Sequence, residues 1–412
     1  KTINKELTGA QDLYNFLFEA CNIIRGPVSQ DNFKDYITPL LYYKRISDVY
    51  DEETEEALIS SGGDKEYASL PEQHRFVIPD GCHWQEVRER TENLGAAIVG
   101  AMRQIEIANP DTLYGVLSMF SSQKWTNKAI LNDSKIRDLI EHLSKRKLGN
   151  KDYPADLMGD AYEILLKKFA DDSKAQAGEF YTPRSVVRLL VHILDPQPGE
   201  TVYDPACGSG GMLIEAIRYM HDDSLCCGSI FGQEKNVVNA AIAKMNLFLH
   251  GASDFNVMQG DTLRDPKILQ GGNIAKFDCV IANPPFSLEN WGATEWSSDK
   301  YKRNIYGTPS DSCGDYAWIQ HMICSMSSGK GRMAVVMPQG ILFRGNQEAE
   351  IRKQLVESDL IEAVVTLGDK LFYGTGLSPC FLIIRRMKPA HHSGRILMID
   401  GSKILTQKRA QN

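Results

Sequence analysis

The chain has 412 residues, which exceeds the size at which one hydrophobic core usually keeps growing, so we expect two domains. Its contents of 42% hydrophobic and 24% charged residues are typical of a globular protein, and no apolar run approaches the roughly 20 residues that a membrane span needs. The net charge of −7 argues against a protein that wraps nucleic acid alone, because neutralising phosphates requires clustered lysine and arginine. A local basic patch or a basic partner is not excluded by it.

The nine cysteines are odd in number and show no Cys-x-x-Cys spacing. Several lie in apolar runs, among them Cys279, Cys324 and Cys380. No signal-peptide pattern opens the chain. We therefore interpret the cysteines as reduced core thiols of a cytoplasmic protein, and we expect neither a disulfide framework nor a metal site.

Residues 1–170 are predicted to form a mainly helical domain. Apolar residues recur there at helical spacing, and helical segments are expected at 13–24, 40–49, 84–108, 136–147 and 157–169. The acidic run 51–56 is interpreted as a solvated helix end, and the turn-rich stretches 60–64 and 70–81 as loops. No residue of this region carries chemistry by itself, so a partner-binding role and a scaffold role stay open.

From about residue 178 apolar strands alternate with helical segments, which is typical of a parallel, doubly wound α/β sheet. Strands are expected at 201–205, 228–233, 256–260, 277–282, 332–337, 361–367, 380–385 and 395–399. Helices are expected at 184–194, 211–222, 236–250, 313–328 and 346–357. This α/β domain is predicted to span 171–412. Ligands of such sheets bind at the carboxyl ends of the strands, so the residues that follow each strand form the candidate site.

The first of these strand ends is rich in glycine. Asp204 closes the strand, and Pro205-Ala206-Cys207-Gly208-Ser209-Gly210-Gly211 leads into a helix. Glycines let a backbone approach a ligand closely, and a helix N-terminus offers free N–H groups to an anion. The spacing matches neither Gly-x-Gly-x-x-Gly nor a phosphate loop with Gly-Lys-Ser/Thr, so we expect a carboxylate there rather than a nucleotide phosphate.

Acidic residues close the next two strands. Glu234 follows Asp204 by 30 positions and is suited to accept hydrogen bonds from a ribose diol. Asp261 closes the third strand, where its carboxylate can accept a hydrogen bond from an adenine amine. Taken singly, each acid is more often a surface or capping residue, but their succession at consecutive strand ends favours a binding site.

The fourth strand ends in Ile281-Ala282-Asn283-Pro284-Pro285-Phe286. The two prolines fix φ and remove two backbone donors, so the strand must stop and its last carbonyl oxygens stay unpaired. Asn283 adds a side-chain amide with donor and acceptor capacity. A rigid cluster of acceptors beside an aromatic face suits a planar group that bears an exocyclic amine. A strand-ending turn without function is the alternative, and the three preceding strand ends argue against it.

Asp204-Pro205 with Gly208 and Gly210, followed by Asn283-Pro284-Pro285-Phe286, resembles the motifs of S-adenosylmethionine-dependent N6-adenine DNA methyltransferases. The closest resemblance is to the methylation (M) subunit of type I restriction–modification systems. Further agreement comes from the segments 178–184, 317–321, 331–338 and 372–376. The resemblance covers about residues 178–400 with specific motifs, whereas the helical half is similar only in character and length. It implies a Rossmann-like fold for the α/β domain.

The resemblance also implies S-adenosylmethionine as the cofactor. In this family the segment before the glycine loop closes over the cofactor, which here is Glu179, Phe180, Tyr181, Thr182, Pro183 and Arg184. The other cofactor-binding residues that it implies are Asp204, Gly208, Ser209, Gly210, Gly211, Glu234 and Asp261.

The reaction implied by the resemblance is methyl transfer to the N6 amine of adenine, a poor nucleophile because its lone pair is delocalised into the ring. We hypothesise that the Asn283 side-chain oxygen and the Pro284 carbonyl accept its two N–H groups, which aims the lone pair at the sulfonium methyl. Pro285 keeps the turn rigid, and Phe286 stacks on the adenine, which must be flipped out of the duplex. No metal or covalent intermediate is required.

Residues 287–312 form a long polar stretch without an apolar pattern, which is usual for a functional or disordered loop. Aromatic residues alternate there with basic ones: Trp291, Trp296, Tyr301 and Tyr306 lie beside Lys300, Lys302 and Arg303. This composition suggests contact with DNA, without a catalytic role for any of these side chains.

Only 26 residues follow Arg386, which is too few for a target-recognition domain. The resemblance implies that recognition is delegated to a separate specificity subunit. We expect two copies of this chain per specificity subunit, a restriction subunit in the full complex, and duplex DNA as the substrate. We expect no membrane association, and a truncated or disordered C-terminal tail.

Three alternatives stay open. A self-sufficient N6-adenine DNA methyltransferase that is cut before its recognition domain has the same motifs. Glutamine N5-methyltransferases that act on translation release factors also carry Asn-Pro-Pro-aromatic, but usually with Tyr in fourth place and without a Phe-Tyr-Thr-Pro segment. A non-catalytic assembly subunit would keep the fold, although the intact 204–211 and 283–286 argue against it. Binding of S-adenosylmethionine discriminates this last alternative from an enzyme.

Overall fold

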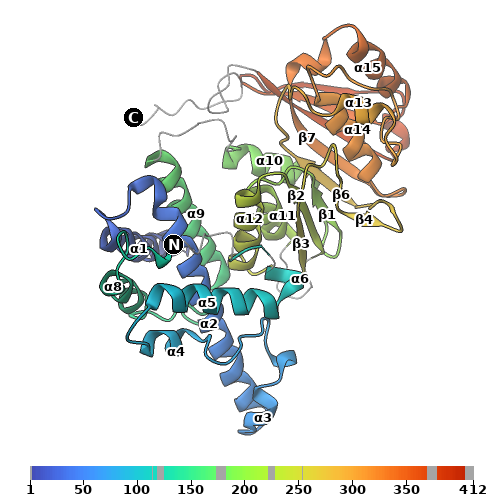
Figure 1. Ribbon diagram of the computed structural model, residues 1–412. Coiled ribbons are helices and arrows are strands. Elements are labelled where there is room, and N and C mark those ends of the chain that lie inside the picture. Colours follow the sequence, from blue (N-terminus) through green and yellow to red (C-terminus); the bar gives the residue numbers. More distant parts are fainter. Residues whose placement is uncertain are drawn as a thin grey trace. The chain divides into compact units, whose positions relative to one another are not determined.

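The computed structural model describes residues 2–113, 115–117, 125–172, 182–220, 228–252, 254–368 and 378–403 (Figure 1). The chain forms two compact units: the first comprises 1–175 with 244–251, and the second comprises 176–243 with 252–412. Helix α12 (Val237–Leu249) is divided between them. None of the helices in the described ranges is long and apolar enough to cross a membrane.

The first unit is helical. Its long helices are α1 (Thr2–Ile24), α2 (Phe33–Ser60), α5 (Leu94–Ala108), α8 (Asp133–Leu143) and α9 (Ala155–Asp172), and its short ones are η1 (Gln30–Asn32), α3 (Lys65–Ala68), η2 (Pro71–Gln73), α4 (Trp84–Glu89) and α6 (Pro110–Leu113). The apolar residues that predicted α1, such as Leu13 and Leu17, are buried where it packs against α8 and α9. The predicted segment 84–108 is two helices, because Asn93 adopts a left-handed conformation (φ 54°) immediately before α5.

The acidic run 51–56 is not the solvated helix end that the sequence suggested. Helix α2 continues beyond it, and Glu52 is buried. The Glu52 carboxylate accepts hydrogen bonds from the backbone N–H groups of Asn150 (2.6 Å) and Lys151 (3.1 Å). A side chain at Gly149 would collide with this carboxylate, since an added Cβ would lie 2.0 Å from Glu52 Oε1. The acid therefore anchors a loop about 100 residues away along the chain, which a run of acids cannot reveal.

The second unit contains an eight-stranded sheet (Figure 1). Its strands are β1 (Val202–Asp204), β2 (Ile230–Glu234), β3 (Phe255–Gln259), β6 (Cys279–Ala282), β7 (Arg332–Pro338), β8 (Ile361–Thr366), β9 (Pro379–Arg385) and β10 (Leu397–Asp400), in the spatial order β10-β8-β9-β7-β6-β1-β2-β3. The eight predicted strands are confirmed. Strands β6 and β7 are buried along their whole length, as their uninterrupted apolar runs require.

The sheet departs from the expected parallel arrangement at one strand. β9 runs antiparallel to both of its neighbours, β7 and β8, whereas the other neighbouring pairs are parallel. A buried apolar run has the same pattern in either direction, so the sequence did not reveal this reversal. The hairpin of β4 (Leu269–Gln270) and β5 (Asn273–Ile274) also lies outside the predicted strands.

The five helices predicted for the α/β domain are confirmed: α10 (Arg184–Leu194), α11 (Gly211–Met220), α12, which is divided between the units, α14 (Asp315–Ser325) and α15 (Gln347–Glu357). The short segments α13 (Ala293–Ser297), η3 (Gln339–Leu342) and η4 (Ala390–His392) were not predicted. Along the chain the strands proceed from β1 outward to β2 and β3, and then return to β6 and β7 on the other side of β1. The order therefore reverses between β1 and β6, which is where ligands of open α/β sheets bind.

Candidate functional site

Four neighbouring strand ends bring predicted site residues to one edge of the sheet. In the spatial order β3-β2-β1-β6, these strands end at or just before Asp261, Glu234, Asp204 and Asn283. All four strands are parallel, so their carboxyl ends lie on the same side. The structure therefore gathers these residues as expected from the sequence, and each is held by different contacts.

The glycine loop after β1 is folded onto the end of β2. Gly208 (φ 54°) and Gly210 (φ 86°) adopt left-handed conformations that side chains disfavour. The Gly208 N–H donates to Glu234 Oε2 at 2.9 Å, and the Cys207 N–H donates to the Gln233 carbonyl at 3.1 Å. The loop then enters α11 at Gly211, directly after Ser209 and Gly210. The backbone is thus preformed at this strand end, with the first turn of α11 behind it.

The carboxyl group of Asp204 is buried beneath this loop. Its Oδ1 accepts the Ala206 N–H at 2.9 Å, and the residue is 2% exposed. Burial raises the pKa of Asp204 to about 8; the Ala206 N–H opposes this shift and the charge of Glu234 adds to it. Near neutral pH the pair therefore carries less than two negative charges, and a cationic ligand group beside it would favour ionisation of Asp204.

Asp261 contacts its own loop and Lys235, a residue that belongs to none of the sequence motifs. Its Oδ2 lies 2.9 Å from Lys235 Nζ, and its Oδ1 accepts the N–H groups of Leu263 (3.2 Å) and Arg264 (3.3 Å). The neighbouring Thr262 hydroxyl donates to the carbonyl oxygen of Pro205 at 2.6 Å. The loop after β3 is thus attached to the glycine loop after β1.

The turn after β6 leaves one buried acceptor without a donor. Asn283 Nδ2 donates to Thr182 Oγ1 at 2.8 Å, whereas Asn283 Oδ1 is buried and has no hydrogen-bond partner among the described residues. A buried acceptor without a donor costs roughly 1–3 kcal/mol, so a molecule that donates to it would recover that free energy. Pro284 is buried beside it, and Pro285 and Phe286 are half-buried. This edge of the sheet can therefore accept a hydrogen bond from a bound molecule.

Thr182 reaches this turn from the segment that was expected to close over a cofactor. It precedes Pro183, the N-cap of α10, and Arg184, which is exposed at the first position of that helix. Glu179, Phe180 and Tyr181 lie outside the described residues, as does the segment 372–376. The contact between Thr182 and Asn283 was not foreseen, because 101 residues separate the two in sequence.

The loop 287–312 contradicts the expectation of DNA contact at three of its residues. Trp291, Trp296 and Arg303 are buried. The Arg303 guanidinium donates to both oxygens of Asp299, to the carbonyl oxygens of Thr262 and Leu263, and to His321 Nδ1. It also stacks 4.4 Å from the centre of the Trp296 ring. An interior cation with every N–H engaged is structural, and only the exposed Lys300 and Lys302 stay available to an anion.

His321 extends this buried network to β1. Burial and the charge of Arg303 hold the pKa of His321 well below its usual range, so the imidazole is neutral. Because Nδ1 accepts from Arg303, the proton lies on Nε2, which donates to the Tyr203 hydroxyl at 3.1 Å. Tyr203 directly precedes Asp204, so Arg303 and His321 connect the loops after β1, β3 and β6.

A second buried group, missed in the sequence, holds the residue after Phe286. Ser287 has a positive φ (49°), and its N–H donates to Asp315 Oδ1 at 2.7 Å. Asp315 is fully buried and binds the Arg344 guanidinium, which also donates to Glu348 at 2.7 Å. Ser287 and Asp315 lie 28 residues apart along the chain, and Asp315 and Arg344 lie 29 apart, so no motif linked them.

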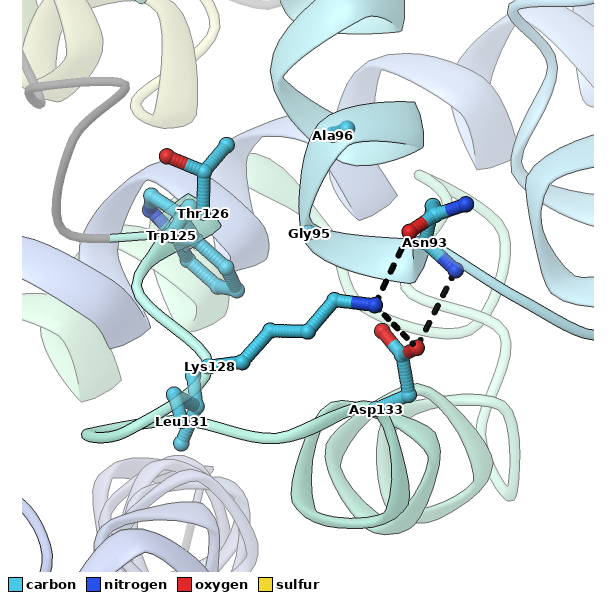
Figure 2. A pocket seen from close by; sticks show the side chains of 8 residues that line it. All are labelled: Asn93, Gly95, Ala96, Trp125, Thr126, Lys128, Leu131 and Asp133. Atoms are coloured by element: carbon cyan, nitrogen blue, oxygen red, sulfur yellow. Dashed lines mark hydrogen bonds and ion pairs between the residues drawn. The ribbon is translucent and has the colours of Figure 1, made fainter.

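A separate cavity of about 110 Å³ lies in the helical unit (Figure 2). It is lined by Asn93, Gly95, Ala96, Trp125, Thr126, Lys128, Leu131 and Asp133. Lys128 Nζ lies 2.9 Å from Asn93 Oδ1 and 3.3 Å from Asp133 Oδ2, and Asp133 also accepts the Asn93 N–H at 3.1 Å (Figure 2). Its charged groups are thus paired with one another, and none of the predicted site residues lines it.

Comparison with known proteins covers both units. The family model described as N-6 DNA Methylase matches residues 153–412, and the one described as HsdM N-terminal domain matches 13–143. The type I restriction enzyme MjaVII methylase subunit of Methanocaldococcus jannaschii is 34% identical over an alignment of 381 positions, gaps included, that covers 88% of this chain and 63% of the relative. The MjaVIII methylase subunit of the same organism is 34% identical over an alignment of 424 positions, gaps included, that covers 96% of this chain and 69% of the relative.

A solved structure has the same fold. The type I restriction-modification system methyltransferase subunit from Streptococcus thermophilus matches with a TM-score of 0.79 at 26% identity, over 98% of this chain and 90% of that one. This match extends over the helical region as well as the mostly parallel sheet.

Proposed function

The chain belongs to the N-6 DNA methylase family, and from that premise we propose that it transfers a methyl group from S-adenosylmethionine to the N6 amine of a flipped adenine in duplex DNA. The observation that carries the proposal is the Asn283 amide: its Nδ2 is held by Thr182 and its buried Oδ1 has no donor among the described residues. An exocyclic amine is a donor that fits this acceptor.

The strand ends suit S-adenosylmethionine, which supplies the methyl group when bound. The left-handed Gly208 and Gly210 let the backbone approach its amino-acid part, and the first turn of α11 offers N–H groups to its carboxylate. The Glu234 carboxylate accepts the backbone N–H groups of Gly208 and Asn236, and we propose that it also accepts the ribose hydroxyls. Asp261 is proposed to accept from the adenine amine of the cofactor, and Asp204 to balance its positive charge.

In the proposed reaction the chain positions the substrate amine and stabilises charge on it. Asn283 Oδ1 and the Pro284 carbonyl each accept one N–H of adenine N6, so the lone pair of the nitrogen is aimed away from the acceptors. The new N–C bond would form as the methyl–sulfur bond of the sulfonium breaks, and these two oxygens would stabilise the positive charge that develops on N6. One N6 proton then leaves to solvent, which restores a neutral amine. By accepting a hydrogen bond from Asn283 Nδ2, Thr182 orients the amide so that Oδ1 faces the substrate. Phe286, half-buried beside the turn, is proposed to stack on the flipped base.

We further propose that 1–170 and 171–412 act as a helical domain and a catalytic domain, and that target recognition is delegated. A specificity subunit would bind two copies of this chain, with a restriction subunit completing the assembly. The similarity to type I methylase subunits supports this arrangement. A cytoplasmic location is proposed as well, since the described cysteines, such as the buried Cys207 and Cys279, are free thiols.

The test has two stages. Calorimetric titration of the chain with S-adenosylmethionine should give one binding site, because the cofactor loops are preformed. Methyl transfer to duplex DNA should then appear only when the specificity partner is added, since the chain has a net charge of −7. No cofactor binding would favour an assembly subunit without catalysis, and efficient site-specific transfer by the chain alone would favour a self-sufficient enzyme.

A further inference from the structure

An exposed aromatic side chain lies at the same edge of the sheet as the acceptor turn. Phe343 is 73% exposed and follows η3, directly after β7. β7 is the parallel neighbour of β6, with Val335 opposite Ala282, so both strands deliver the residues that follow them to one edge. Single exposed apolar side chains are common on protein surfaces, but among the described residues Phe343 is the only exposed phenylalanine or tryptophan, and it lies at this edge.

The turn that carries Phe343 is held firmly by its neighbours. The N–H groups of Phe343 and Arg344 both donate to the Gly340 carbonyl, at 3.2 and 2.9 Å. Arg352 Nη1 donates to the carbonyl oxygens of Ile341 (3.2 Å) and Arg344 (2.8 Å). An added Cβ on Gly340 would lie 2.7 Å from Arg344 Nη1, so glycine makes room for the guanidinium. The backbone is therefore fixed on both sides of Phe343 while its ring faces solvent.

A short path of buried polar contacts connects this turn to the acceptor turn. Arg344, next to Phe343, binds Asp315, and Asp315 accepts the N–H of Ser287, next to Phe286. Asp315 is fully buried. Burial disfavours the charged form of Arg344, but its hydrogen bonds to Glu348 and Asp315 outweigh this and raise its pKa, so the guanidinium stays charged. Only two side chains separate the backbone beside one phenylalanine from the backbone beside the other.

We propose that Phe343 is a wedge that enters the base stack of duplex DNA and takes the place of the adenine that leaves it. This inference rests on the proposed function, since a wedge is needed only if the target base is flipped. Proteins commonly unstack a duplex by inserting an apolar side chain between base steps. The two aromatic residues then have separate tasks: Phe286 meets the flipped base, and Phe343 fills the gap in the helix. The exposed Lys300 and Lys302 supply cations for the backbone phosphates.

The test uses the chain assembled with its specificity partner, on a duplex that carries the site methylated by the wild-type assembly. Two duplexes are compared, with the target adenine opposite thymine or opposite a mismatched cytosine. On the paired duplex, Phe343→Ala should slow single-turnover methyl transfer by about ten- to a hundredfold, the range of a lost stacking contact. On the mismatched duplex most of this loss should disappear, because the base is already unpaired. Phe343→Trp should retain most of the activity on both.

Met387→Ala is the matched control. Met387 is 69% exposed in the same unit, but it follows β9, which is antiparallel and ends at Arg385, opposite Arg332 at the start of β7. It therefore lies toward the opposite edge, and Met387→Ala should equal the wild type on both duplexes. Cofactor affinity should be unchanged in every variant.

Two outcomes would overturn the wedge alone: a Phe343→Ala variant as fast as the wild type on paired DNA, or an equal loss on paired and mismatched DNA, which is the sign of a structural role. A wild-type assembly that transfers no methyl group to adenine would overturn the proposed function instead, and the need for a wedge with it.

Discussion

The proposed site has a cofactor side, formed by the loops after β1, β2 and β3, and a substrate side, formed by the turn after β6. The two sides differ in whether their acceptor oxygens receive hydrogen bonds from the protein itself. On the cofactor side, Asp204, Glu234 and Asp261 each accept a hydrogen bond from the backbone. On the substrate side, Asn283 Oδ1 is buried without a donor among the described residues. A satisfied loop keeps its shape without a ligand, whereas an unsatisfied acceptor gains stability when a donor arrives. We therefore expect cofactor binding to be autonomous and the acceptor turn to be completed by the substrate.

The largest expected effect comes from Asn283→Ala, which removes the acceptor oxygen of the substrate side and leaves the cofactor side unchanged. Methyl transfer should fall by at least about 10²–10³-fold, the usual cost of losing a group that stabilises transition-state charge. Cofactor affinity measured by calorimetry should stay within about twofold, because the removed oxygen serves the acceptor base. Asn304→Ala makes the same chemical change in an exposed part of the following loop and should be neutral. Joint loss of cofactor binding and activity would make Asn283 a structural residue.

Glu234→Ala breaks the cofactor side. It removes the proposed acceptor of the ribose hydroxyls and frees the Gly208 N–H, so cofactor binding should weaken by roughly 1–3 kcal/mol, about 5–150-fold. Asp261→Ala should weaken binding less and reduce discrimination against cofactor analogues that lack the adenine amine. Asp265→Ala, an exposed acid nearby, is the control for the change in charge. An unchanged dissociation constant for Glu234→Ala would remove this residue from the site.

Thr182→Val keeps the acceptor groups of the cofactor side and of the substrate side, and removes only the hydrogen bond that holds the Asn283 amide. Without the 2.8 Å contact the amide can rotate, and we expect methyl transfer to slow by about three- to tenfold, the worth of one hydrogen bond. The rates are compared at saturating S-adenosylmethionine, because Thr182 is also expected to contact the cofactor, and Thr182→Ser should restore the rate. A valine variant with the wild-type rate would show that Thr182 does not set the orientation of the amide.

The last prediction has no expected effect on the comparison of rates; it is on stability and concerns Asp204. Its pKa is raised from the unfolded value of 3.8 to about 8 by burial, so between these pH values the folded chain holds a proton that the unfolded chain has lost. Folding stability should therefore decrease as pH rises from about 4 to about 8. Asp204→Asn cannot ionise and should lose less stability over this window in thermal unfolding without cofactor. Parallel pH profiles for the two proteins would contradict a protonated Asp204.

The local chemistry of the site could be predicted because it lies within single short segments. Gly208 and Gly210 adopt the left-handed conformations that justify glycine there, and Asn283 follows a buried strand that two prolines terminate. The strand ends could be placed side by side because alternating strands and helices leave few possible topologies. The fold class and all eight strands were obtained in this way.

What the sequence did not reveal depends on contacts between distant residues. The sequence suggested that Arg303 and Trp296 lie on a surface that contacts DNA. Both residues are buried instead, and carbonyl oxygens of another loop accept hydrogen bonds from the Arg303 guanidinium. The hydrogen bonds that connect Ser287, Asp315 and Arg344 correspond to no periodic pattern in the sequence. The direction of β9 cannot be predicted from its apolar run, because parallel and antiparallel buried strands have the same pattern. In each case the residue types were ordinary, and only the fold supplied their partners.

The most direct test of the central claim is the chemical identity of the methylated product. The chain, its specificity partner, duplex DNA and S-adenosylmethionine with a labelled methyl group are incubated, and the DNA is digested to nucleosides for mass spectrometry. We predict that the label appears in N6-methyldeoxyadenosine and that this product is missing with Asn283→Ala. Label in methylated cytosine, or in a glutamine side chain of a protein rather than in DNA, would contradict the assignment of adenine N6 as the acceptor.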